Sequence, residues 1–115
     1  MPGPARAGQA DPAKNAAIQF TLTGSETLDA TTVTAADFTV ANGSAPTISC
    51  AGSTCTVTTT ATADGNVVMG LAAGFSVSDP AGNAATTAGG TDRTVTYDSV
   101  TPTVTLVQSA TQTDP

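Results

Sequence analysis

Residues 16–24 read AAIQFTLTG, and this stretch decides the fold. Its apolar and polar side chains alternate strictly: Ile18, Phe20 and Leu22 against Gln19, Thr21 and Thr23. A period of two residues puts the apolar side chains on one face of an extended chain, which is typical of a β-strand with one buried face. The stretch therefore predicts a strand that packs on a core through its three large apolar side chains.

The same alternation recurs along the rest of the chain. Further strands are predicted in DFTV (37–40), PTISC (46–50), CTVTTTATA (55–63), NVVMGL (66–71) and RTVTYD (93–98). The pairs Asn42-Gly43 and Asp64-Gly65 are typical of tight hairpin turns, so we expect hairpins at both places. Short strands between polar turns, without a helical period, predict an all-β protein, specifically an immunoglobulin-like antiparallel β-sandwich.

Composition limits the function. The 115 residues suffice for one domain, and the three Lys and Arg residues against nine Asp and Glu give a net charge of -6. So few cations cannot neutralise phosphates, and no apolar run approaches the ~20 residues that span a bilayer, so we expect neither nucleic acid nor membrane insertion. The chain has no His and no Gly-x-Ser-x-Gly motif, so we do not expect an enzyme.

The only two cysteines, Cys50 and Cys55, stand in SCAGSTC with Gly52 between them. This spacing suits a hairpin bridged at its mouth, so a disulfide is predicted, and a disulfide indicates an oxidising compartment. The alternatives are two free thiols or half of a metal site. A tetrahedral zinc site needs four ligands, and the chain offers no His and no further Cys.

A short echo marks the two ends of the chain. Residues 9–12 read QADP and residues 112–115 read QTDP, an offset of 103 residues (112 minus 9). A period of about 100 residues matches one immunoglobulin-like sandwich. The chain is therefore predicted to hold an irregular N-terminal segment (1–10), one repeat (11–98), and a linker with the first strand of the next repeat (99–115).

Four motifs resemble one family: IQFTLTGSETL (18–28), TAADFTV (34–40), AAGFSVSDPAGNAA (72–85) and TVTYDSVTPTVTLV (94–107). They are similar to the bacterial Ig-like repeats of giant adhesins and biofilm-associated surface proteins. The resemblance implies a tandem-repeat protein that is extracellular or displayed on the bacterial cell surface, with Ca²⁺ at the joints between repeats in several members. The cysteine hairpin is not a usual feature of such repeats, and DSVTPT lacks the second acidic or Asn residue often seen in their linkers.

Calcium is thus the one cofactor expected, at the domain ends. The candidate ligands are Asp79, Asn83 and Asp98, with Asp11 and Asp114 as further oxygen donors, because Ca²⁺ takes six to eight oxygens. We expect an ion near Asp98, with the 79–83 turn at the same end of the domain. The alternative is that residues 79–83, DPAGN, form a turn and nothing more, since Asp, Pro, Gly and Asn each suit a turn by themselves.

The predicted function is that of a structural spacer or stalk repeat in a surface adhesin, with neighbouring identical repeats as partners. The alternative is a ligand-binding adhesive module for a glycan or a protein. Aromatic residues make up 3% of the chain, whereas binding hot spots are rich in Trp and Tyr, which favours the spacer.

The C-terminal segment suggests how copies could associate. Thr103, Val104, Thr105, Leu106 and Val107 alternate like a strand, whereas the prolines at positions 2, 4 and 12 make the N-terminal segment a poor first strand. We hypothesise that this strand-addition segment fills the first-strand position of another molecule, head to tail. The alternative is that the segment stays disordered or packs on its own domain.

Overall fold

The structure is a computed structural model that describes residues 8–89 and 93–115. Its described residues form eight strands: β1 (Ala17–Thr23), β2 (Phe38–Ala41), β3 (Thr47–Ala51), β4 (Thr54–Thr60), β5 (Gly65–Leu71), β6 (Val77–Ser78), β7 (Ala84–Ala85) and β8 (Thr94–Tyr97). Two short 3₁₀ helices, η1 (Ala30–Thr32) and η2 (Ala35–Asp37), are the helical elements of this part of the chain. The prediction of an all-β fold is confirmed.

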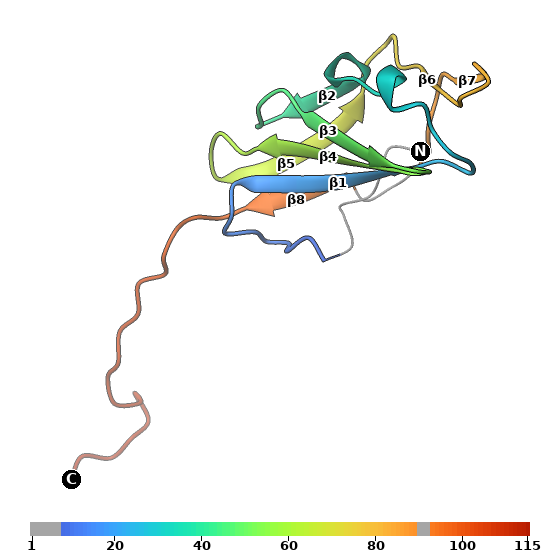
Figure 1. Cartoon of the computed structure of the whole chain (residues 1–115). Helices are drawn as coiled ribbons and strands as arrows, with labels where there is room; N and C mark the ends of the chain where they lie inside the picture. The colour runs from blue at the N-terminus through green and yellow to red at the C-terminus, as the bar shows by residue number, and fades with distance from the viewer. Residues whose placement is uncertain (1–7, 90–92) are drawn as a thin grey trace.

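The strands form two antiparallel three-stranded sheets and one small hairpin (Figure 1). The first sheet has the order β1-β4-β3 and the second the order β2-β5-β8, while β6 pairs with β7. In the first sheet Thr21, Thr56 and Ser49 stand opposite one another on the outward face, with β-branched threonines at the positions that favour them. The alternation in the sequence therefore places hydroxyl side chains on the outward face of this sheet and apolar side chains on its inward face.

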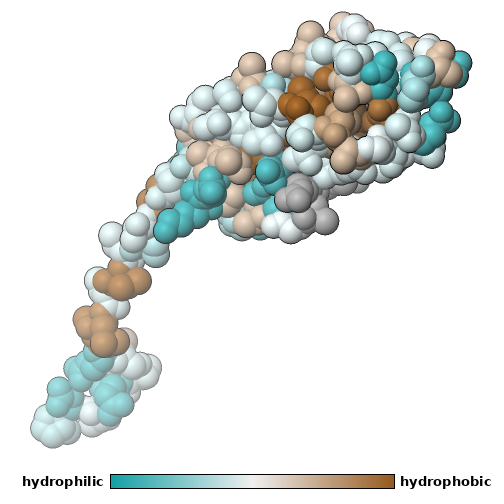
Figure 2. Space-filling model, in the orientation of Figure 1, coloured by the Kyte–Doolittle hydropathy of each residue, from teal (hydrophilic) through white to brown (hydrophobic). Residues whose placement is uncertain are grey.

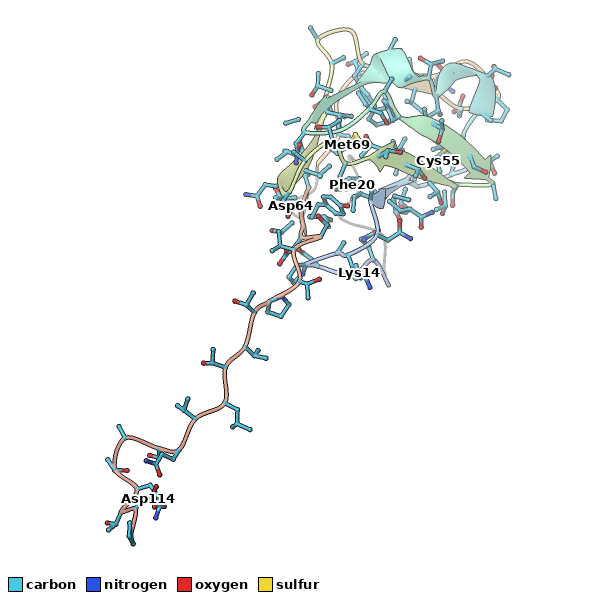
Figure 3. The ribbon with its side chains drawn as sticks, turned by 90° about the vertical axis from the view of Figure 1, so that its left-hand side faces the viewer. Lys14, Phe20, Cys55, Asp64, Met69 and Asp114 are labelled. Carbon is cyan, nitrogen blue, oxygen red and sulfur yellow. A yellow bond between two sulfur atoms is a disulfide. The ribbon has the colours of Figure 1, made fainter. Side chains whose placement is uncertain are left out.

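Both sheets contribute their inward side chains to one core. The buried apolar side chains of the strands are Ile18, Phe20, Leu22, Phe38, Cys55, Val57, Val67, Met69, Val77 and Val95. Phe20 of β1 and Met69 of β5 come from different sheets and lie between them (Figure 3). Burial of each side chain of this size stabilises the fold by about 1.5–3 kcal/mol, so this core holds the two sheets together. The predicted packing of residues 16–24 on a core is thus part of that contact.

The predicted hairpins at residues 42–43 and 64–65 are wrong. Asn42 (φ 61°) and Gly65 (φ 127°) do turn the chain, but each turn joins strands of different sheets. Asn42 ties the two crossings together, because its Nδ2 donates to the Ala63 carbonyl at 2.7 Å and its Oδ1 accepts from the Thr62 hydroxyl at 2.9 Å. The dipeptides Asn-Gly and Asp-Gly indicate a left-handed backbone conformation. Which sheet the following strand joins depends on where its apolar face can be buried.

A buried carboxylate fastens the segment between β1 and β2. Asp37 is 6% exposed, and its oxygens accept from the Thr34 N–H at 2.9 Å and from the Ser76 N–H at 3.1 Å. The second bond anchors the chain that carries Phe75, whose ring meets Phe38 edge-on at 6.1 Å between centroids. Strand alternation does not predict this contact, because the two segments lie 39 residues apart.

The chain approaches its first strand alongside its last one. Ala13, 2% exposed, forms a parallel bridge with Tyr97, donates to the Thr96 carbonyl at 2.7 Å and accepts from the Asp98 N–H at 2.8 Å. The predicted segment 1–10 lies mostly outside the described residues. Residues 99–115, all of them described, form no strand and leave the sheets as an extended tail, which makes the molecule 80 Å long against 24 × 20 Å across (Figure 1).

Candidate functional site

The predicted disulfide is present and closes the β3–β4 hairpin. Cys50 and Cys55 are a cross-strand pair with their Cα atoms 3.9 Å apart, and their sulfurs are bonded. Gly52 turns the chain between them with φ 60°, a conformation that costs glycine little. Cys55 is fully buried at the edge of the core, so the bond joins the hairpin to the packed interior.

Residues 79–83 form the turn of the β6–β7 hairpin, as the turn interpretation predicted. Asp79 holds this turn, because its Oδ1 accepts from the Asn83 N–H at 2.8 Å and its Oδ2 from the Asn83 side-chain amide at 3.0 Å. Gly82 takes a positive φ of 95° and donates to the Asp79 carbonyl at 3.0 Å. These bonds occupy both carboxylate oxygens of Asp79.

A second carboxylate, Glu26, lies beside Asp79. A hydrogen bond with Asp79 and the charge of Asp79 raise the pKa of Glu26. The side-chain and backbone hydrogen bonds from Asn83 lower the pKa of Asp79. As the pH falls, Glu26 therefore takes up a proton before Asp79 does. Sequence reasoning missed this pair, because Glu26 follows β1 by three residues and nothing local indicates that it faces a turn more than fifty residues later.

The two carboxylates line a pocket of about 360 Å³. Its walls come from the chain after β1 and from the β6–β7 hairpin, and include Leu28, Val77 and Asn83. The volume is at the lower end of the range for small-molecule sites. The pocket combines an apolar wall with negative charge, an arrangement suited to a small cationic or hydroxyl-rich group.

Asp98 lies at the other end of the domain, so the expectation that it shares an end with the 79–83 turn is wrong. Asp79 and Thr23, the last residue of β1, line the same pocket. Asp98 bonds to Ala13, near the start of β1, and the seven residues of β1 span about 20 Å. Figure 1 likewise shows β6 and β7 at the end opposite the tail.

The three predicted calcium ligands therefore do not converge on one ion. Within the described ranges 8–89 and 93–115, no three His, Cys, Asp or Glu side chains gather closely enough to hold a metal. Calcium at a joint between repeats stays a prediction, since such a joint would draw ligands from two domains.

Three carboxylates instead hold the base of the tail. The Oδ1 atoms of Asp11, Asp64 and Asp98 accept from the backbone N–H groups of residues 96, 99 and 100 at 3.0, 3.1 and 3.0 Å. Asp64 also accepts from the Ser99 hydroxyl at 2.6 Å. Sequence reasoning treated Asp64 only as a turn residue. Its position in the crossing from β4 to β5 lets it set the direction in which the tail leaves the domain.

The tail exposes several large apolar side chains among polar ones. In the strand-addition segment, Val104, Leu106 and Val107 are 88%, 98% and 80% exposed. Figure 2 shows such hydrophobic groups along the tail between pale and teal ones, and Figure 3 shows Asp114 close to its far end. In the described part of the chain, these apolar side chains are not packed against the sheets.

Comparisons with protein-family models, with curated proteins and with solved structures gave no match. Among residues 8–89 and 93–115, no helix has the length and apolar character needed to cross a membrane.

Proposed function

We propose that this chain is a structural spacer module, an immunoglobulin-like sandwich strung head to tail with copies of itself in a secreted or surface-displayed bacterial adhesin. The sheet orders β1-β4-β3 and β2-β5-β8 correspond to the B-E-D and C-F-G strands of a constant-type immunoglobulin domain. Residues 8–13 take the place of its first strand. The surface role also draws on the family resemblance of the four sequence motifs, and the disulfide suits an oxidising exterior.

The observation that carries the proposal is the parallel bridge between Ala13 and Tyr97. Because the segment at Ala13 runs parallel to β8, the chain heads toward the tail end of the domain when it enters, and it heads the same way again when it leaves through β8. A domain crossed in this way can be joined to the next in line. Asp64 and Asp98 support this function, since they bind the first residues after β8 and limit swivelling at the joint.

A two-copy protein tests the spacer function. Residues 9–111 would be followed directly by residues 9–115, so that the echo sets the register of the joint. Small-angle X-ray scattering should show one elongated particle, longer than a single copy by about the length of one domain. The matched control replaces residues 99–108 of the joint with Gly and Ser, which gives a flexible linker of equal length. A two-copy protein as compact and as variable as this control would contradict the proposal.

The pocket beside Glu26 and Asp79 favours a second candidate function, that of a ligand-binding module. A glycan hydroxyl or an amine could bind the carboxylates while Leu28 and Val77 contact its apolar part. Titration with neutral and amino sugars, followed by NMR, should then shift amide signals of the chain after β1 and of the β6–β7 hairpin. Shifts spread evenly over the domain, or no shifts, would contradict the ligand-binding function and leave the spacer as the single candidate.

A further inference from the structure

The starting point is the position that the first echo occupies in its own domain. Gln9 Oε1 accepts from the Gln19 N–H of β1 at 2.9 Å, and Asp11 Oδ1 accepts from the Thr96 N–H of β8 at 3.0 Å. These two strands belong to different sheets. Residues 9–12 therefore bridge the two sheets along one side of the domain, and we call this position the N-terminal seat.

The tail carries a second set of the same groups. Gln112 and Asp114 repeat the spacing of Gln9 and Asp11, and both are exposed. The two glutamines also make the same local hydrogen bond, because Gln9 Nε2 donates to the Ala10 carbonyl at 2.9 Å and Gln112 Nε2 donates to the next carbonyl at 2.9 Å. The second echo is thus already held in a local conformation related to that of the first.

Burial of the tail's exposed apolar side chains would also favour association. Most of the large hydrophobic side chains exposed in the described part of the chain belong to residues 99–115: Val100, Val104, Leu106 and Val107. Exposed apolar rows of this kind mark interaction surfaces. Four residues separate the segment 103–107 from the second echo, so binding of this echo to a surface would bring the segment close to the same surface.

We propose that the tail of one molecule binds the N-terminal seat of a second copy, with Gln112 and Asp114 replacing Gln9 and Asp11 on the N–H groups of Gln19 and Thr96. Residues 103–107 then lie along the same side of the second copy. The repeated tetrapeptide covers residues 9–12 only, so these residues of that copy give way while Ala13 keeps its own bridge. The proposal extends the spacer function, since the same register would join successive repeats within one longer chain.

The geometry also determines the strength and form of this association. The resident echo is covalently attached, so it competes as an intramolecular ligand at an effective concentration in the millimolar range. Exchange in the unmodified chain is therefore weak. Each molecule offers one tail and one seat, so the contact is heterologous and the assembly stays open at both ends.

Sedimentation velocity of the full chain over a concentration series tests the exchange. The substitutions Gln9→Ala and Asp11→Ala together weaken the resident echo and should increase association at least tenfold. The matched pair Gln112→Ala and Asp114→Ala, added to those two substitutions, weakens the incoming echo and should abolish the increased association while keeping every apolar side chain of the tail. Unchanged association in either variant would overturn the proposal, because it would mean no contact at all or nonspecific adhesion through the apolar residues.

A second measurement covers the case in which the first variant loses its fold. A fluorescent peptide of residues 99–115 is added to the unmodified chain, beside the same peptide with Gln112→Ala and Asp114→Ala. Tighter binding of the unmodified peptide supports the seat, and equal binding of both contradicts it. The scattering of the two-copy protein does not depend on exchange, so the spacer function and this inference can fail separately.

Discussion

Reduction of the Cys50–Cys55 disulfide tests how much of the stability depends on the hairpin that it closes. The bond joins residues five positions apart. The loop-closure relation gives about 2 kcal/mol for a loop of this size, because a short loop loses little freedom when its ends are joined. Truncation of a buried Phe such as Phe20 costs about 3–5 kcal/mol, so the core outweighs the disulfide.

The assay is urea unfolding of the protein with and without reductant. We expect a lower midpoint after reduction, with the fold still present at 25 °C, and a melting temperature lower by roughly 10 °C for a domain of this size. The control is the double variant Cys50→Ala with Cys55→Ala, whose stability should not respond to reductant. It should be less stable than the reduced protein, because Cys55 is fully buried and Ala leaves a cavity.

Two outcomes would refute this reasoning. If the reduced protein is unfolded without urea, the disulfide contributes more than chain entropy allows and the sheets do not hold together by their core. If reduction changes nothing, the hairpin is already as restricted in the unfolded chain as in the folded one. The expected intermediate result would mean that the domain can fold before it is oxidised, which suits an exported protein.

Further predictions concern the carboxylates and calcium. Asp37→Ala should destabilise the protein by about 3 kcal/mol in urea unfolding, because two part-buried hydrogen bonds lose their charged acceptor, whereas Asp37→Asn keeps one oxygen and should cost less; equal losses would contradict the acceptor role. For the pair of Glu26 and Asp79, the raised pKa of Glu26 means that stability falls as pH rises through that pKa, while the lowered pKa of Asp79 means that stability falls when Asp79 is protonated. Glu26→Gln should therefore raise the melting temperature more near neutral pH than near pH 4, and a pH-independent difference would count against the interaction between the two carboxylates. Asp64→Ala should increase the fast NMR motion of Ser99 and of the tail base without unfolding the domain, and unchanged relaxation would exclude a role in fixing the tail. Calcium should raise the melting temperature of the two-copy protein more than that of the single copy, with magnesium as control, and equal shifts would argue against a site at the joint.

Several features were readable from the sequence because they are local. Alternation in residues 16–24 and 94–97 assigns each side chain to a face, since neighbouring side chains on a strand point in opposite directions. The structure buries Ile18, Phe20, Leu22 and Val95 and leaves Tyr97 partly buried. The Cys50–Cys55 bridge and the turn at residues 79–83 are similarly local, since each closes within six residues or fewer. The sequence by itself determined the six longer strands, β1 to β5 and β8, with most of their buried side chains, and one hairpin with its disulfide, whereas β6 and β7 were not predicted and residues 103–107 form no strand.

Pairing between distant strands was decided by the tertiary structure. The turns at Asn42 and Gly65 show that the chain changes direction, yet whether the next strand stays in the sheet or crosses to the other depends on where its apolar face is buried. The same long-range packing brings Asp37 to Ser76, Glu26 to Asp79 and Asp64 to Ser99. It also separates Asp98 from residues 79–83, because β1 extends from one end of the domain to the other. The alternation of a strand can be read from the sequence, but which residues lie at which end of the domain depends on how the sheets pack.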